Sequence, residues 1–275
     1  MAPIVRTLAL WLSGLAVALA IGAAHAGELD TAFAVNSPNS TMTIDHSAWD
    51  KILSTYVAVS PDGINRFAYG RVSTAGKQAL KVYLAKLQSV KVTALAESEQ
   101  RAFWINLYNA LTIDVVLDHY PVETIRDISL GGGLFAVGPW KKALATVEGR
   151  KLSLDNIEHD ILRKLWRDPR VHYAVNCASI SCPNLLAEAF TGAKLDRMLT
   201  QGARAYVNHR RGVNASGGRL RLSSIYDWYA KDFGSGDAEV IAHVSAYAEP
   251  ALKQQLAGIR TIAGYDYDWS LNEVK

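Results

Sequence analysis

Apolar side chains recur at every third or fourth position over several stretches of this chain, which is the spacing of a helix with one buried face. Trp49, Ile52, Leu53 and Tyr56 follow this spacing and predict a helix from 45 to 57. The stretch AFWINLYNALTIDVVL is apolar on nearly every side, so the helix that we expect over 98–119 lies in the interior. The same reasoning predicts further helices over 74–90, 153–166, 193–208, 224–229 and 238–247.

Strand signals are short and few. Alternation of apolar and polar residues predicts a strand over 171–176, and turn residues predict hairpins at Glu148-Gly149 and Gly217-Gly218. The segment 259–272 predicts a final strand or pair of strands. Because helices outnumber strands without a regular strand and helix repeat, we expect an α+β fold, a single helix-rich domain with a small, mostly antiparallel sheet. A papain-like or transglutaminase-like arrangement is one candidate architecture.

The first 26 residues have the pattern of a cleaved secretory signal. Arg6 precedes an apolar stretch of about 14 residues, shorter than the roughly 18 to 20 that span a bilayer, and Ala24 and Ala26 supply the small residues of a cleavage site. We therefore expect a signal peptide over 1–26, a flexible leader over 27–43 and one globular domain over 44–275. The expected location is periplasmic or secreted, without membrane attachment after cleavage.

Charge and composition narrow the class of partner. Lys and Arg number 29 against 26 Asp and Glu, and signal cleavage would remove only Arg6. This balance is too even to indicate nucleic acid or an anionic membrane surface as a partner. Seven Trp and 12 Tyr favour an aromatic-lined cleft. We expect a small-molecule, peptide or envelope-polymer ligand, and no spacing in the sequence indicates a cofactor or a metal centre.

Two amides interrupt the apolar helix over 98–119. Asn106 and Asn109 are three residues apart, so both point the same way into the interior. One interpretation is that they tie down a loop by hydrogen-bonding its backbone, as buried polar groups usually do. The other is that they bind substrate or donate to an oxyanion.

Glu158 lies within the apolar stripe of the helix over 153–166, and His159 lies at its edge. A carboxylate on a buried face must be paired, or burial raises its pKa. The partner could be an arginine such as Arg126 or Arg170, which would make Glu158 structural. Alternatively, Glu158 could be an acid, a base or a carboxylate that orients a histidine.

The two cysteines of the chain, Cys177 and Cys182, lie five positions apart in the loop NCASISCPN, just after His172. An oxidising compartment favours a disulfide between them wherever the Cα atoms come within about 7 Å. A nucleophilic thiolate instead needs a lowered pKa and an open approach. On a straight strand Cys177 would lie about 16 Å beyond His172, so a Cys-His pair requires a sharp bend after Asn176.

Four ordered motifs, AFWINLYNALT, LSLDNIEHDILR, DPRVHYAVNCASISCP and LSSIYDWYAKDFG, make the chain resemble the domain-of-unknown-function 547 family over about 98–234. The resemblance implies an exported bacterial protein and no established activity. The family's pattern falls on Trp104, Asn106, Asn109, Glu158, His159, His172, Cys177, Ser179 and Pro183. Family members often have serine at the position of Cys182. The resemblance therefore argues against a disulfide that all members share.

These observations leave two hypotheses. In the first, Cys177 attacks an acyl or amide carbon, His159 or His172 is the base, and Glu158 orients the base, while Asn106, Asn109, Trp104 and Ser179 bind substrate or the oxyanion. In the second, the protein is a non-catalytic binding or scaffold domain in which Cys177 and Cys182 form a disulfide. A thiol-redox role is disfavoured by the four residues between the cysteines.

Overall fold

The computed structural model describes residues 28–130 and 137–274. The predicted signal peptide lies outside the described residues. The α+β class is confirmed, with helices predominating over three small sheets. No helix within the two described ranges combines the length and the hydropathy needed to cross a membrane.

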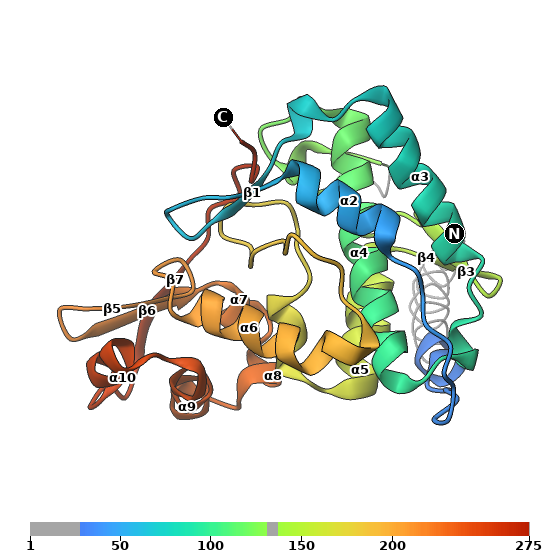
Figure 1. Ribbon diagram of the computed structural model, residues 1–275. Coiled ribbons are helices and arrows are strands. Elements are labelled where there is room, and N and C mark those ends of the chain that lie inside the picture. Colours follow the sequence, from blue (N-terminus) through green and yellow to red (C-terminus); the bar gives the residue numbers. More distant parts are fainter. Residues whose placement is uncertain (1–27, 131–136, 275) are drawn as a thin grey trace, which may run out of the picture.

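Helix α4 (Glu97–His119) runs through the middle of the first half of the chain, as Figure 1 shows. Helix α3 (Thr74–Gln88) packs beside it, and α2 (Ser47–Tyr56) packs against α3. Nearly every residue of α4 from Ala102 to Leu117 is buried, because apolar side chains on all sides of a helix favour complete enclosure. The helices predicted over 45–57, 74–90 and 98–119 are confirmed within about two residues at each end.

The strands form two hairpins and one three-stranded sheet. Strands β1 (Val57–Val59) and β2 (Asn65–Phe67) pair antiparallel, as do β3 (Ala145–Val147) and β4 (Arg150–Leu152). In the third sheet β5 (Val213–Ser216) pairs antiparallel with β6 (Arg219–Ser223), which pairs in parallel with β7 (Ile262–Asp266).

Both predicted hairpin turns are confirmed. Glu148 and Gly149 have φ of 45° and 77°, and Gly217 and Gly218 have φ of 58° and 71°. Two successive positive φ angles match the right-handed twist of the strands that a two-residue turn joins.

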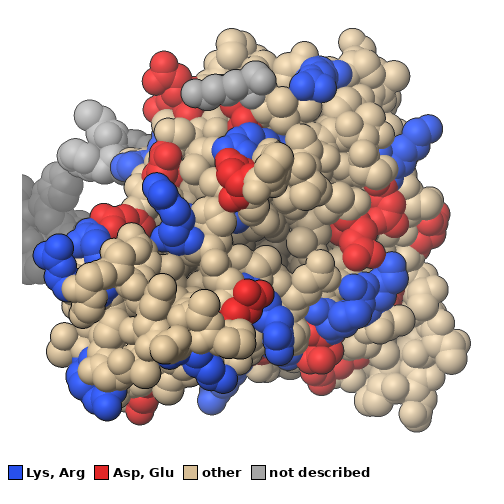
Figure 2. Space-filling view, turned by 60° about the vertical axis from the view of Figure 1, so that its left-hand side comes forward, with Lys and Arg blue, Asp and Glu red and all other residues tan. Residues whose placement is uncertain are grey.

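The second half of the chain surrounds the three-stranded sheet with short helices (Figure 1). These are α6 (Leu195–Val207), α7 (Ile225–Trp228), α8 (Ala230–Phe233), α9 (Asp237–Tyr247) and α10 (Pro250–Leu256). Buried side chains of these helices and of the sheet form a second hydrophobic cluster, whereas Leu195, Met198 and Leu199 of α6 belong to the larger cluster around α4. On the face that Figure 2 shows, Lys and Arg are interspersed with Asp and Glu, without a large patch of one sign.

The segment 171–176 corrects the sequence prediction, because it is not a strand. Residues Pro169–Tyr173 form a 3₁₀ helix that Asp168 caps by accepting a hydrogen bond from the Arg170 N–H. Val171 and Val175 belong to the cluster around α4, whereas Tyr173 belongs to the second cluster. The alternating pattern thus arises from a chain that passes between two cores, and alternation alone does not distinguish that from a strand.

Two other segments differ from the prediction. Residues 28–33, expected in a flexible leader, are helical, and Leu29 and Phe33 are buried. The Phe33 ring contacts the edge of Trp104 at 4.8 Å between centroids, so packing against α4 fixes a helix too short to show a periodic pattern. The predicted helix over 153–166 is largely π-helical, over Asn156–Leu162, and ends in α5 (Arg163–Trp166).

Candidate functional site

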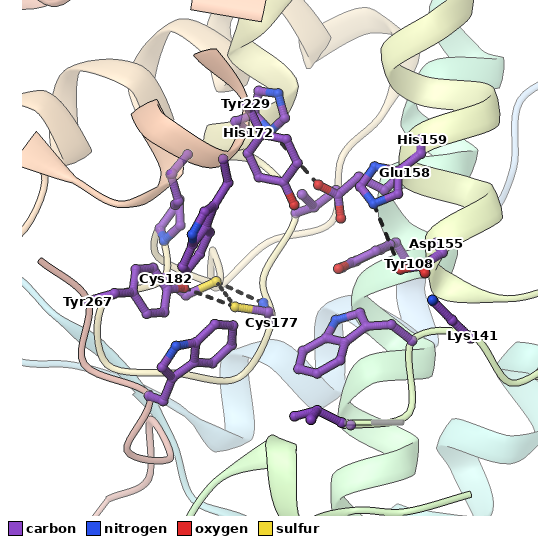
Figure 3. A pocket seen from close by; sticks show the side chains of 18 residues that line it. Tyr108, Lys141, Asp155, Glu158, His159, His172, Cys177, Cys182, Tyr229 and Tyr267 are labelled. Atoms are coloured by element: carbon purple, nitrogen blue, oxygen red, sulfur yellow. Dashed lines mark hydrogen bonds and ion pairs between the residues drawn. The ribbon is translucent and has the colours of Figure 1, made fainter. Parts of the chain in front are cut away.

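A cavity of about 540 Å³ opens where the two hydrophobic clusters meet. Its volume lies within the range of small-molecule sites. Figure 3 shows Cys177 and Cys182 on one side, which we call the thiol side, and Asp155, Glu158 and His159 on the opposite side, which we call the acidic side. Aromatic residues complete the lining: Tyr108, Trp140, Trp228, Tyr229, Tyr267 and Trp269.

The thiol side depends on a sharp bend after Asn176, which the nucleophile hypothesis requires. Ala178 has a φ of 59°, in the left-handed region that residues other than glycine rarely adopt. The Asn176 side chain holds this bend, since its oxygen accepts a hydrogen bond from the Ala178 N–H at 2.9 Å and its nitrogen donates to the Pro183 carbonyl at 2.6 Å. The bend brings the two sulfur atoms within 2.8 Å of each other.

Three polar groups surround the Cys177 sulfur. The Cys182 thiol lies at 2.8 Å, the Tyr267 hydroxyl at 3.1 Å and the Ser179 hydroxyl at 3.4 Å. Ser179 also donates to the Tyr267 oxygen at 2.9 Å, which leaves the Tyr267 proton to point at the sulfur. Burial raises the pKa of Tyr267 well above its usual value, so this hydroxyl stays protonated and remains a donor.

The two thiols differ in acidity. The hydrogen bond from Cys182 lowers the pKa of Cys177, and those from Ser179 and Tyr267 act in the same direction against the effect of burial. Burial raises the pKa of Cys182 well above its usual value. Cys177 is also the more exposed of the two. Both thiols line the cavity, and Cys177 is therefore the one that ionises first.

On the acidic side, His172 is held between two carboxylates. Its Nε2 lies 2.7 Å from an Asp232 oxygen, and its Nδ1 lies 3.9 Å from a Glu158 oxygen. The imidazole stacks on Tyr229 at 4.2 Å between centroids. Although burial opposes it, the hydrogen bonds from His172 and Arg163 hold the pKa of the Asp232 carboxyl well below its usual range. Asp232 is therefore an anion that orients the ring.

Glu158 is almost fully buried, with 7% of its side chain exposed, as its place on an apolar face predicts. Its neighbours are His172 and the Tyr229 hydroxyl, whose pKa is raised first by burial and then by Glu158. Neither of the arginines predicted as partners contacts it, since Arg126 stacks on Trp269 and Arg170 pairs with Asp168. The structural ion pair is thus corrected to a carboxylate beside a histidine.

His159 lies at the rim of the acidic side, with 37% of its side chain exposed. Its Nδ1 lies 3.0 Å from an Arg163 nitrogen, and its Nε2 lies 3.8 Å from an Asp155 oxygen. His159 and His172 line the same cavity as Cys177. No hydrogen bond joins either sulfur to a histidine nitrogen in the described part of the chain.

Asn106 and Asn109 do not line the cavity, and their contacts are those of loop anchors. Asn109 donates to the Ala174 carbonyl at 2.9 Å and accepts from the Asn176 N–H at 2.8 Å. Asn106 bonds both backbone groups of Phe190 in the same way, at 2.7 and 3.0 Å. The predicted oxyanion or substrate role does not match these positions.

Trp104 and Ser179 also lie outside the cavity lining. The indole of Trp104 is fully buried between Phe33 and Phe103. Ser179 is buried as well, and it acts on Cys177 from behind, through Tyr267. Neither side chain is therefore placed to touch a ligand.

Four functional side chains were missed by the sequence reasoning, namely Asp155, Tyr229, Asp232 and Tyr267. Tyr229 and Asp232 lie within the quoted motif LSSIYDWYAKDFG, but only the tertiary fold brings them to His172. Across the described residues, no three His, Cys, Asp or Glu side chains are placed to hold a metal ion together.

Comparison with family models matches residues 92–207 to a family described as "Protein of unknown function, DUF547". Neither a curated protein nor a solved structure matches the chain. The matched segment carries α4, the π-helical segment and both cysteines, whereas Tyr229, Asp232, Tyr267 and Trp269 come from the chain beyond it. The site is therefore completed by residues outside the matched segment.

Proposed function

Residues 92–207 belong to the domain-of-unknown-function 547 family, and on that premise we propose that the protein is a thiol-dependent acyl or amide hydrolase or transferase that acts in the periplasm. The observation that carries the proposal is that a thiol with a lowered pKa opens into the same cavity as a carboxylate-held histidine. Perturbed groups that converge on a cleft are typical of catalytic sites.

In the first half of the reaction, the Cys177 thiolate attacks the carbonyl carbon of an ester or amide. A carbon–sulfur bond forms, and the bond to the leaving oxygen or nitrogen breaks. The leaving group needs a proton, and the groups across the cavity that could supply one are His172 and Glu158, which lie 3.9 Å apart. Cys177 needs no adjacent base for this step, because hydrogen bonds from Cys182 and Tyr267 stabilise the thiolate directly.

In the second half, water or another nucleophile attacks the thioester. The attacking group gives its proton to the acidic side, the carbon–sulfur bond breaks, and Cys177 leaves as a thiolate. Asp232 acts here as a positioning residue, since it holds Nε2 of His172 at 2.7 Å and keeps Nδ1 toward Glu158. The roles of base and orienting carboxylate thus fall on His172 and Asp232.

The test is a reaction of the reduced full chain with p-nitrophenyl acetate. We expect acetylation on the peptide that carries Cys177 by mass spectrometry, with turnover that disappears in Cys177→Ala and persists in Cys182→Ser. His172→Asn should slow turnover by at least a hundredfold. The matched control is His119→Asn, since His119 lies at the end of α4 and not in the cavity lining. Equal turnover by the wild type and Cys177→Ala would refute the proposal.

The second candidate is a binding or scaffold domain with a Cys177–Cys182 disulfide. It is favoured by the 2.8 Å between the sulfur atoms, which lets a bond form with little movement of the backbone. Thiol titration of periplasmically produced protein under denaturing conditions, without reductant, distinguishes the two. Two free thiols per chain support the enzyme, and none supports the scaffold.

A further inference from the structure

The acidic side of the cavity holds two carboxylates that form no ion pair with a lysine or an arginine of the described residues. Asp155 and Glu158 both line the cavity, opposite the thiols in Figure 3. The Asp155 side chain accepts no hydrogen bond from any other described residue, and its one ion-pair contact is His159 Nε2 at 3.8 Å. Burial raises the pKa of this carboxyl, as expected for a carboxylate that lacks a close cation.

His159 is the basic side chain in ion-pair contact with Asp155, and it offsets the effect of burial only in part. Its Nδ1 lies 3.0 Å from a guanidinium nitrogen of Arg163. Because a guanidinium only donates, Nδ1 must accept, and Nε2 is then the ring nitrogen that faces Asp155. At 3.8 Å this contact is longer than a hydrogen bond, and the Asp155 pKa stays raised.

The other cations near the acidic side are engaged or distant. His172 and Arg163 both bind Asp232. Lys141 lines the cavity but is exposed, and it acts on Asp155 from beyond ion-pair distance. A cationic group that entered the cavity would thus meet two carboxylates that, among the described residues, form no ion pair with a lysine or an arginine.

Aromatic rings form the rest of the enclosure. Trp269 contacts Trp140, Trp228 and Tyr267 at 5.8, 5.5 and 4.6 Å between centroids. Trp228 is 46% exposed and Val137 is 55% exposed, and both line the cavity. Ring faces attract cations as well as apolar groups, which is why sites for ammonium ligands combine aromatic rings with carboxylates.

We propose that this cavity binds an organic ammonium ion, with its apolar part on the tryptophans and its charge at Asp155 and Glu158. We assign this ammonium ion the role of acyl acceptor, and this assignment rests on the proposed function of Cys177. It loses one proton to a carboxylate, and its nitrogen attacks the thioester carbon on Cys177. The carbon–nitrogen bond forms, the carbon–sulfur bond breaks, the nitrogen loses a second proton, and both protons pass to solvent.

Binding is tested on the full chain carrying Cys177→Ala, so that no chemistry interferes. Calorimetric titration at pH 7 compares phenethylammonium with 2-phenylethanol, which has the same ring and no charge. We expect the ammonium to bind at least tenfold more tightly. This comparison needs no further substitution, so a folding defect cannot imitate its result. Equal affinities would overturn the proposal.

Charge variants locate the site. Asp155→Asn should remove most of the preference for the ammonium. The matched control is Asp160→Asn, because Asp160 lies on the same π-helical segment, bonds Asn156 and does not line the cavity. Lys141→Met should tighten ammonium binding, since it removes a like charge from the rim. Equal effects of Asp155→Asn and Asp160→Asn would overturn the assignment.

Failure of the proposed function gives a different result. If phenethylammonium binds with the expected dependence on Asp155 but Cys177 is never acylated, the thiol chemistry is wrong and the ammonium site stands. If Cys177 is acylated and the thioester is released at the same rate with and without phenethylamine, while the amine fails to bind, the ammonium site is wrong and the hydrolase stands.

Discussion

Asn109 gives the most direct test of how the thiol side is held. Asn109 lies on α4 with 3% of the residue exposed, and its side chain bridges two backbone groups of the segment that leads into Cys177. It donates to the Ala174 carbonyl at 2.9 Å and accepts from the Asn176 N–H at 2.8 Å. The substitution Asn109→Ala removes both hydrogen bonds at once and introduces no new polar group.

The magnitude follows from the two backbone groups left behind. Each buried group without a partner costs about 1–3 kcal/mol. Two such groups predict a loss of about 2–6 kcal/mol in the free energy of unfolding, to which the small void of the missing amide adds. That loss is a large fraction of the roughly 5–15 kcal/mol that stabilises a typical protein.

The assay is urea unfolding of the reduced protein, followed by tryptophan fluorescence at pH 7. The matched control is Asn214→Ala, since Asn214 is exposed on β5 and has no side-chain hydrogen bond within the described ranges. We expect its effect to stay within about 0.5 kcal/mol. A loss below about 1 kcal/mol for Asn109→Ala would refute the reasoning that this amide anchors the loop.

Three further predictions concern the thiols and the second cluster. Iodoacetamide should alkylate Cys177 half-maximally at a pH below the usual thiol value of about 8.5, and Cys182→Ser should change this midpoint; a midpoint above 8.5 in the wild type would contradict the thiolate. Diamide should join Cys177 to Cys182 and abolish alkylation until a reductant is added; continued alkylation would exclude the pairing. Burial lowers the pKa of His243 to about 4. Stability should therefore fall by about 2 kcal/mol as the pH drops from 6.5 to 4, since the unfolded chain takes up the proton first, and a His243→Asn variant with the same loss would contradict this.

Much of the fold could be predicted from local patterns. The helices over 47–56, 74–88 and 97–119 follow apolar spacing, and the hairpins at Glu148-Gly149 and Gly217-Gly218 follow turn chemistry. Each of these signals arises within a few residues, so no distant contact is needed to interpret it. Apolar spacing also predicted a helix over 153–166, but nothing local indicated its π geometry at Asn156–Leu162 or the 3₁₀ helix at Pro169–Tyr173.

Local patterns indicated some features of the candidate site, but they did not indicate which distant residues contact one another there. The sequence by itself indicated that Glu158 lies on a buried face, that Asn109 is an interior amide and that Cys177 and Cys182 share a short loop. Tertiary structure alone decided that Glu158 faces His172, that Asp232 orients this ring from 60 residues away, and that Tyr267 donates to the sulfur from 90 residues away. Periodicity reports which side of an element is buried, but the partner of a buried polar group depends on which distant segment packs there, and no local pattern encodes that choice.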